Sequence, residues 1–301
     1  VVLNPLDRDL TTPELVDASA GCRVIVAHRA TPGEPELFDQ SPELVAFLRC
    51  AVDISTIDVE AASRSGVLIA RAGPTYVAST AELALGLLLD TARHISTSTL
   101  DYGTGEQPPQ RLGRQLSGRT AGIIGYGAIG RYLADVLIAL GMQVVVHDPF
   151  VDEMADHTTN MDLLDLLSQS DVVFPLAPGQ PSTENLIGRA ELAAMKPGAI
   201  LINVSRGELL DEAAVGEALD NGQLGALGMD VGRAPDQRPS PSLAARPGVV
   251  ATPHLGGLTP ENAYAQALSS VEQVQAIIDK TMPPRAVNAE AASRLRSYWA
   301  R

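Results

Sequence analysis

A glycine-rich turn between a buried strand and an amphipathic helix constrains the fold of this chain more than any other feature. The turn lies in the segment TAGIIGYGAIGRYLADVLIALGMQVVVHDP, from Thr120 to Pro149. It runs from Gly125 to Gly130, and the expected cofactor-binding residues in it are Gly125, Gly127, Ala128, Ile129 and Gly130. The first glycine permits the tight turn, the second lets a pyrophosphate approach the main chain, and the third lets the helix pack on the strand. In this strand, turn and helix context the pattern indicates a dinucleotide-binding site.

An acidic residue follows the second strand of this unit. Asp148 comes about 20 residues after Gly125, the distance typical of the ribose-binding acid in such sites, and directly follows the apolar run 144–147. A carboxylate at this place can accept hydrogen bonds from both hydroxyls of an adenosine ribose, and its charge would repel a 2′-phosphate. We therefore expect NAD rather than NADP, and a site in which neighbouring groups admit both cofactors stays open.

Short aliphatic or β-branched runs alternate with amphipathic helical stretches along the chain. The expected strands are 24–27, 67–70, 120–124, 144–147, 172–176, 199–204, 226–231 and 249–251. Strands that alternate with helices are typical of a parallel sheet in an α/β fold. The densest part of the pattern, 116–254, predicts one doubly wound domain of the Rossmann type, so the flanking segments must form a second structure.

Two long helices are expected near the ends of this domain. The segment STAELALGLLLDTARH, from Ser79 to His94, is apolar nearly all round, which predicts burial between domains or between subunits. We expect a homodimer with this helix at the interface, because one small domain can hardly cover it. The second helix begins at Thr259-Pro260 and runs to about Lys280. The connection 101–110 contains glycine and proline and few apolar residues, which predicts a surface loop.

Composition excludes several classes of protein. A length of 301 residues predicts two domains, and a net charge of -14 with a pI near 4.7 argues against nucleic acid or anionic lipid as a partner. The cysteines, Cys22 and Cys50, form no CxxC motif, and no histidines stand at metal-ligand spacing, so neither a disulfide framework nor a metal site is expected. We see no apolar run long enough for a membrane span and no secretory leader, and we expect a cytoplasmic protein.

Three further segments carry a family resemblance. They are MKPGAILINVSRGELLDEAAV (195–215), LGMDV (227–231) and ATPHLGG (251–257). In this order they resemble the D-isomer-specific 2-hydroxyacid dehydrogenase family, in particular its phosphoglycerate and hydroxypyruvate dehydrogenases. The resemblance implies an NAD-dependent enzyme that acts on the CH–OH group of a small 2-hydroxy acid. It also implies a dinucleotide domain at 79–257, inserted in a smaller flavodoxin-like α/β substrate domain formed by 1–78 and 258–301.

Arg206 and His254 are the expected catalytic residues. Arg206 follows a buried strand at the edge where ligands of open α/β sheets bind, and its planar fork of donors suits the carboxylate and carbonyl of a 2-keto acid. His254 also follows a strand, before Gly256-Gly257, and histidine is the side chain best matched to proton transfer near neutrality. The resemblance assigns these roles to the same two positions. The other histidines are expected to be structural or solvated: His28, His94, His147 and His157.

Several cofactor contacts are implied by the resemblance alone. Asp230 and the main chain at Val204 are expected at the nicotinamide carboxamide. Ala177, Pro178 and Thr183 match positions that line the cofactor cleft.

The chain departs from the family pattern at two places. The acid that pairs with the catalytic histidine is replaced by Pro235, and the adjacent Asp236 could serve instead. The glycine-rich turn that binds the substrate carboxylate aligns with 49–58, which has Ala51 and Asp53 where glycines are expected. We expect Asp53 to point to solvent, which leaves the amides near Val52 and Asp53 able to bind.

A second wall of the substrate pocket is expected nearby. The loop 71–76 contains Gly73, and its Arg71 could add a positive charge. The opening VVLNPLD resembles the second strand of the family's substrate domain, so one βα unit of roughly 30 residues is expected upstream of the given sequence.

Two other functions stay open. An NAD-binding regulator or pseudo-enzyme, similar to the family's corepressor branch, would explain the missing acid and glycines, whereas Arg206 and His254 favour an enzyme. A dehydrogenase with another hydride donor, as in the formate and phosphite branches, is the third reading.

Overall fold

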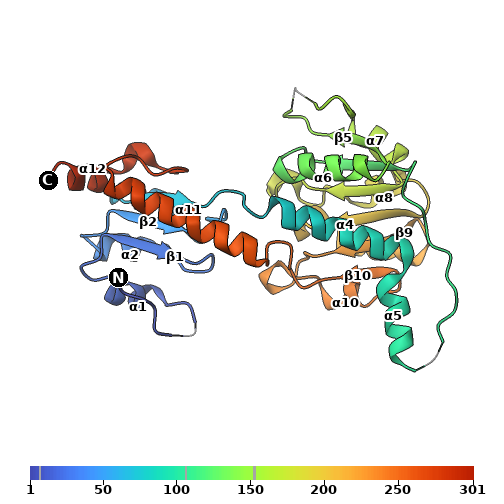
Figure 1. Cartoon of the computed structure of the whole chain (residues 1–301), viewed down its shortest axis with the longest axis horizontal. Helices are drawn as coiled ribbons and strands as arrows, with labels where there is room; N and C mark the ends of the chain where they lie inside the picture. Colours follow the sequence, from blue (N-terminus) through green and yellow to red (C-terminus); the bar gives the residue numbers. More distant parts are fainter. Residues whose placement is uncertain (7, 106, 152–153) are drawn as a thin grey trace. The chain divides into compact units, whose positions relative to one another are not determined.

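The computed structural model describes residues 1–6, 8–105, 107–151 and 154–301. The chain forms two compact units, each with its own sheet and core (Figure 1). The larger unit comprises Tyr76–Thr259, and the smaller unit comprises Val1–Thr75 together with Pro260–Arg301. The larger unit is therefore an insertion in the sequence of the smaller one.

The larger unit is built on a sheet of seven parallel strands within the described residues. They are β4 (Thr120–Ile124), β5 (Gln143–His147), β6 (Thr158–Asn160), β7 (Val172–Pro175), β8 (Ala199–Asn203), β9 (Leu224–Met229) and β10 (Val249–Ala251). Their order is β10-β9-β8-β7-β4-β5-β6, so the chain winds outward in both directions from the neighbours β4 and β7. This confirms the predicted doubly wound sheet, and its switch point lies between the ends of these two strands.

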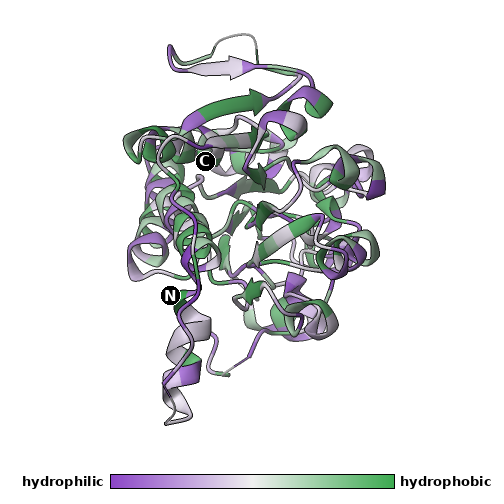
Figure 2. Ribbon diagram, turned by 90° about the vertical axis from the view of Figure 1, so that its right-hand side faces the viewer, coloured by the Kyte–Doolittle hydropathy of each residue, from purple (hydrophilic) through white to green (hydrophobic). Residues whose placement is uncertain are grey.

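Helices cover both faces of this sheet, which is why its inner strands are apolar on both sides (Figures 1 and 2). One face packs against α4 (Val77–Arg93) and α6 (Ala128–Ala139). The other packs against α7 (Leu163–Gln169), α8 (Arg189–Ala194), α9 (Glu212–Asp220) and α10 (Pro241–Ala244). Neighbouring residues of one strand point to opposite cores, as Ile200 and Leu201 of β8 do.

The smaller unit has its own parallel sheet, with the described strands in the order β1-β2-β3. The strands are β1 (Val24–Ala27), β2 (Ala46–Arg49) and β3 (Leu68–Arg71). Its helices are α1 (Thr12–Ala18), α2 (Pro35–Gln40), α3 (Val59–Arg64), α11 (Pro260–Ile278) and α12 (Ser293–Trp299). Residues of α1 to α3 form the core on one face, whereas Ile277 and Leu295 of the carboxyl-terminal segment pack on the other. The smaller unit thus needs both ends of the given sequence.

The sequence analysis missed two strands, and it expected a loop over the end of one helix. β2 is a short, fully buried strand that ends in an arginine, and β6 is a short polar strand (TTN) at the edge of its sheet. The helix is α5 (Ile95–Gly103), which occupies the start of the predicted loop 101–110. Neither a short buried run nor a polar edge strand shows the alternation on which a strand prediction depends.

The helix α4 is largely covered by its own unit. The helix packs against α6, β8, β9 and β10 of its own unit, and Leu89 is its one large apolar side chain among those exposed. The unit therefore covers much of α4 by itself, and the expected dimer interface at this helix stays a prediction. The helix ends at Arg93, because His94 adopts a left-handed conformation with φ of 56°.

Cys22 and Cys50 are free thiols. Both are half-buried, with Cys50 Sγ 3.1 Å from Ser270 Oγ. Among the described residues, no group of three or more His, Cys, Asp or Glu side chains could hold a metal ion. In the same ranges, no helix has both the length and the apolar composition that crossing a membrane requires.

Asp171 connects three strands at the amino edge of the large sheet. Its N–H donates to Thr120 O, its carbonyl accepts from Ile200 N–H, and its Oδ2 accepts from Thr120 N–H at 3.0 Å. Burial raises the pKa of Asp171, but the Thr120 hydrogen bond and the cations Lys196 and Arg119 outweigh it and lower the pKa overall. A lowered pKa in the folded state means that the carboxylate stabilises the fold above its unfolded pKa.

We predict that Asp171→Asn lowers the free energy of unfolding by roughly 1–2 kcal/mol at pH 7, because charge-assisted hydrogen bonds are lost. The difference from the wild type should shrink as the pH falls below about 4, where the unfolded carboxyl takes up a proton, and vanish below the folded pKa. Urea unfolding at several pH values measures this, with the exposed Asp165→Asn as the control. A difference that stays constant with pH would contradict the prediction.

Candidate active site

The sequence-predicted residues of the larger unit follow strands that end at one edge of the sheet. Gly125 follows β4, Asp148 follows β5, Ala177 comes after β7, Arg206 after β8, Asp230 directly after β9 and His254 after β10. Because all these strands are parallel, their carboxyl ends meet at the same edge. The structure therefore places these residues along one edge of the sheet, which includes the switch point between β4 and β7.

The geometry of the turn requires glycine at two of its positions. Gly125 has φ of +100°, and a Cβ there would lie 2.8 Å from Ala177 N. A Cβ on Gly130 would lie 2.3 Å from the carbonyl oxygen of Gly125, so α6 packs on β4 only with glycine at this position. Gly127 differs, because a Cβ there would meet open space just before α6 begins. The first turn of a helix beside open space suits a pyrophosphate, which fits the predicted cofactor.

Asp148 is fixed at the end of β5 by main-chain donors. Its Oδ2 accepts from Tyr126 N–H at 2.7 Å, and its Oδ1 accepts from Phe150 N–H at 2.9 Å. Asn160 of β6 bonds to both main-chain groups of Asp148, at 3.1 Å and 3.0 Å. Asn160 lies in the strand that the sequence analysis missed, so its positioning role had no visible signal.

The loop after β10 is held by the carboxylate of Asp230. This side chain is 1% exposed and accepts three hydrogen bonds, from Thr252 Oγ1 at 2.6 Å, Leu255 N–H at 2.7 Å and Gly256 N–H at 2.8 Å. Thr80 of α4 also donates to Gly256 O. In the structure Asp230 therefore orients the loop that carries His254, and its contact with a nicotinamide stays a prediction.

His254 has a main-chain partner in place of the family's acid. Its Nδ1 lies 2.9 Å from the carbonyl oxygen of Asp236. A carbonyl oxygen only accepts, so Nδ1 carries a proton and Nε2 is the nitrogen left for chemistry. The carboxylate of Asp236 lies 3.7 Å from Arg238. The expected substitute acid thus contacts His254 through its main-chain carbonyl.

A left-handed backbone makes this contact possible. Asp236 and Gln237 have φ of 59° and 54°, and His254 itself has φ of 61°. The carbonyl of Gln237 also accepts from Gly232 N–H, which ties the short turn 235–237 back to the end of β9. Such a conformation is uncommon for residues other than glycine, and no sequence rule would have predicted it here.

Arg206 sits on a loop organised by a fully buried asparagine. Asn203 accepts from Ser205 N–H at 3.1 Å and donates to Arg206 O at 2.8 Å. The Arg206 side chain is half-buried, lies against Gly179, and donates to Ser205 O. Among the described residues it forms no ion pair, so its charge is available for an anionic ligand.

The remaining predicted cofactor residues lie on the same edge. Val204 and Ala177 are buried, and the Ala177 carbonyl accepts from Ser205 Oγ at 2.9 Å. Thr183 Oγ1 donates to Pro178 O at 2.7 Å, which closes the loop after β7. These contacts give each residue a structural role, and their contact with a cofactor stays a prediction.

In the smaller unit, the predicted substrate residues follow β2 and β3. Val52 O accepts from Arg71 Nη1 at 3.3 Å, and Asp53 Oδ1 accepts from Ser55 N–H at 2.9 Å. The Arg285 guanidinium lies over Gly73, where a Cβ would come within 2.7 Å of it. The substrate roles of Val52, Asp53 and Gly73 stay predictions.

Arg49 is a buried cation that the sequence analysis did not single out. It is 0% exposed and donates to the main chain of His28 and Thr31 and, at 2.8 Å, to Thr56 Oγ1. Burial lowers the pKa of Arg49, against the influence of nearby Asp53. The signal was present, because a lone arginine closes the apolar run of β2.

We predict that Asp230→Ala lowers the melting temperature by several degrees, because three donors of the loop 252–256 lose their acceptor. The amides of Leu255 and Gly256 should also exchange with solvent faster. Thr252→Val, which removes one donor and keeps the carboxylate, should have a smaller effect on both readouts. Hydrogen–deuterium exchange with mass spectrometry measures the loop, and unchanged protection in Asp230→Ala would contradict the assigned role.

Comparison with known proteins agrees with this geometry. Residues 85–256 match the family described as D-isomer specific 2-hydroxyacid dehydrogenase, NAD binding domain. The D-3-phosphoglycerate dehydrogenase of Methanocaldococcus jannaschii is 32% identical over 284 residues, which cover 93% of this chain and 54% of that protein. The hydroxypyruvate reductase of Thermotoga maritima is 33% identical over 268 residues, 88% of each protein.

A solved structure is similar over most of the chain. The crystal structure of the TT0316 protein from Thermus thermophilus has a TM-score of 0.84 and 32% identity, and the match covers 92% of this chain and 90% of that one. The chain spans about half the length of the phosphoglycerate dehydrogenases that it matches. The predicted cofactor, NAD, is confirmed by the family match. The chain belongs to the D-isomer specific 2-hydroxyacid dehydrogenase family.

Proposed function

We propose that this protein is an NAD-dependent dehydrogenase that transfers a hydride between the nicotinamide and C2 of a small 2-hydroxy or 2-keto acid. The observation that carries the proposal is the presence of an oriented histidine and an arginine without an ion pair at the same edge of the sheet. His254 has Nδ1 fixed by Asp236 O, and Arg206 has no ion-pair partner among the described residues. Relatives named as a dehydrogenase and a reductase support an enzyme over the corepressor-like regulator.

The cofactor is held, in this proposal, by the glycine turn, by Asp148 and by the loops after β7, β8 and β9. The open space at Gly127 fits a pyrophosphate, and the fixed carboxylate of Asp148 fits the adenosine ribose. When bound, NADH supplies the hydride for reduction of a keto acid. Proteins of this family use their own side chains for the remaining work, which is binding, orientation and proton transfer.

Arg206 binds the keto acid through its planar fork of donors. The guanidinium can bond to the carboxylate and to the carbonyl oxygen, which draws electron density from C2 and favours hydride attack there. Its loop is held rigid by Asn203, so the fork keeps its position during the reaction. The 2-hydroxy acid that forms keeps the same carboxylate contact.

His254 supplies the proton. As the hydride reaches C2 and the carbonyl π bond breaks, the proton on Nε2 of the imidazolium passes to the oxygen, which leaves a neutral imidazole and a 2-hydroxy acid. In the oxidative direction Nε2 accepts the hydroxyl proton. The Asp236 carbonyl keeps the required tautomer but carries no full charge, so it stabilises the imidazolium less than a carboxylate would.

The domain roles and the location belong to the same proposal. We assign cofactor binding to the larger unit and part of the substrate contacts to the smaller one. Two free cysteines fit a reducing compartment such as the cytoplasm. The net charge of -14 favours a small-molecule partner over nucleic acid or an anionic membrane.

We also propose a homodimer, with α5 in the interface. In Figures 1 and 2, α5 extends away from the sheet of its unit. None of its residues, all of which are described, is buried. Its apolar side chains Leu100 and Tyr102 are 72% and 64% exposed, and Leu112 beyond it is 99% exposed. Large exposed apolar side chains on a helix without buried residues support an interaction site here.

The first prediction of this proposal concerns cofactor choice. NADH should bind at least tenfold more tightly than NADPH, a difference of about 1.4 kcal/mol, because the Asp148 carboxylate repels a 2′-phosphate. Asp148→Asn should narrow the ratio of the two dissociation constants, measured by fluorescence titration. Asp165→Asn removes an exposed charge from the same unit and should leave the ratio unchanged. Equal affinities in the wild type would overturn the assignment.

The second prediction concerns catalysis. His254→Ala should cut turnover by roughly 10²- to 10⁴-fold and leave NADH affinity nearly intact, because only proton transfer is lost. Arg206→Ala should raise KM and lower kcat together, because the guanidinium binds the ground state and the polarised carbonyl. Steady-state kinetics with a panel of 2-keto acids tests both, with the exposed His157→Ala as the control. A wild type that binds NADH but reduces no keto acid would favour the regulator.

The third prediction concerns assembly. Leu100→Glu should give a monomer at micromolar concentration, because it places a charge in the proposed apolar interface. Sedimentation velocity compares it with the wild type and with Leu164→Glu, which changes an exposed leucine on α7. A monomeric wild type would refute the dimer, and a dimeric Leu100→Glu would place the interface elsewhere.

A further inference from the structure

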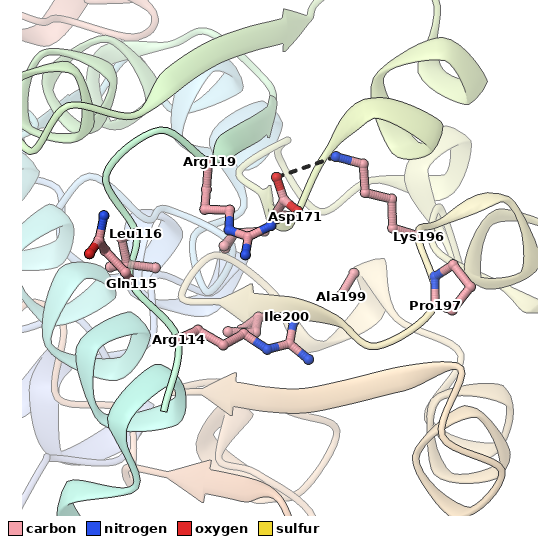
Figure 3. A pocket seen from close by; sticks show the side chains of 10 residues that line it. Arg114, Gln115, Leu116, Arg119, Asp171, Lys196, Pro197, Ala199 and Ile200 are labelled. Atoms are coloured by element: carbon pink, nitrogen blue, oxygen red, sulfur yellow. Dashed lines mark hydrogen bonds and ion pairs between the residues drawn. The ribbon is translucent and has the colours of Figure 1, made fainter. Parts of the chain in front are cut away.

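A cavity lies at the amino edge of the large sheet, opposite to the edge described above (Figure 3). Its volume is about 230 Å³. The walls come from the segment before β4, from Asp171 before β7 and from Lys196-Pro197 before β8. One strand of five residues, at about 3.3 Å per residue, separates this edge from the glycine turn, so the two places are about 15 Å apart.

The charged side chains of this cavity are mostly basic. Arg114, Arg119 and Lys196 line it together with a single carboxylate, Asp171. Lys196 Nζ lies 3.3 Å from Asp171 Oδ2, and Arg119 Nη1 lies 3.5 Å from Oδ1. In Figure 3, Arg119 and Lys196 flank Asp171, and Arg114 lies across the cavity beside Ile200. The lining therefore keeps a surplus of positive charge in a chain whose net charge is -14.

Arg114 is placed by the main chain rather than by a carboxylate. Within the described residues Arg114 forms no ion pair, and its main-chain N–H donates to Ala92 O at 2.8 Å. A Cβ built on Gly198 or on Gly225 would lie 3.1 Å from Arg114 Nη2, so both glycines leave room for the guanidinium. Arg114 also lines a neighbouring cavity together with Asp90. The Oδ1 of Asp90 accepts a hydrogen bond from Ser96 N–H.

The electrostatics of this arrangement favour a divalent anion. Three cations and one carboxylate leave two positive charges without compensation inside the cavity, which a dianion would neutralise and a monocarboxylate would not. Guanidinium groups also match the geometry of tetrahedral oxyanions through paired N–H donors. All three cations are partly exposed, so a ligand from solvent can reach them.

We propose that this cavity is a binding site for a phosphate group, free or as a small monoester, held by Arg114, Arg119 and Lys196. The site is separate from the proposed cofactor and substrate contacts and does not depend on the proposed function. A bound phosphate would link the segment before β4 to the loop before β8. It would thereby stabilise the larger unit without competing with the dinucleotide.

Thermal unfolding tests this site in the presence of saturating NADH, which keeps phosphate from the glycine turn. Ionic strength is held low and constant with potassium chloride, because screening weakens exposed charges. Inorganic phosphate should raise the melting temperature with a saturable concentration dependence, and glycerol phosphate shows whether a monoester also binds. Arg114→Gln should abolish the rise, whereas Arg64→Gln, an exposed arginine of α3 in the smaller unit, should keep it.

Titration calorimetry with phosphate gives an independent readout if Arg114→Gln proves unstable. Heat of binding to the wild type with a stoichiometry of one per chain, measured with NADH bound, supports the site. An equal rise in melting temperature for the wild type and Arg114→Gln would overturn it as a general salt effect. So would the absence of any saturable response to phosphate.

Discussion

Two neighbouring buried polar residues, Asn203 and Asp230, determine where the two candidate catalytic side chains stand. They end β8 and follow β9, and the N–H of Asp230 donates to the carbonyl of Asn203. Asn203 then bonds to the loop of Arg206, and Asp230 bonds to the loop of His254. A buried carboxylate needs its donors as much as the loop needs an acceptor, because an unpaired charge in the interior is costly. The two loops are therefore held from inside the sheet.

Close contacts between glycines extend this arrangement to the partner of His254. A Cβ on Gly207 would lie 2.2 Å from the main chain of Gly232, and a Cβ on Gly232 would lie 2.6 Å from Pro239 Cα. These contacts press the loop after β8 against the loop after β9, and the second loop against the turn that contains Asp236. The carbonyl that holds Nδ1 of His254 thus owes its place to main-chain packing. A side-chain acid would instead depend on the residue type at one position. Because the main chain supplies the partner, Pro235 in place of the acid does not leave His254 without one.

The sequence predicted the doubly wound sheet and the side chains at its carboxyl edge, because each of these depends on local patterns. A glycine turn after an apolar strand, and an arginine or a histidine at a strand end, can be recognised within a few residues. The missed features depend on distant parts of the chain. Asn160 acts from an edge strand of three polar residues, and the role of Asn203 requires knowledge of the loop that folds back on it. The contact of Asp236 depends on a left-handed backbone that its residue type does not require.

Arginine chemistry explains how an acidic chain can bind anions. Lysine occurs at two positions, 196 and 280, so the 22 basic residues are otherwise arginine. Many of these arginines pair with a carboxylate at the surface, as Arg246 does with Asp220 and Arg233 with Glu184. In a one-to-one pair of this kind the two charges cancel, so the pair offers no net charge to a ligand. Arg206 and Arg114 differ, because within the described residues each is placed by main-chain packing and has no ion pair.

With a net charge of -14, the long-range field opposes every anion, so an anion site must rely on local, uncompensated donors. The same requirement applies at both edges of the large sheet. A guanidinium without an ion pair therefore indicates an anion site in this chain better than the overall charge does.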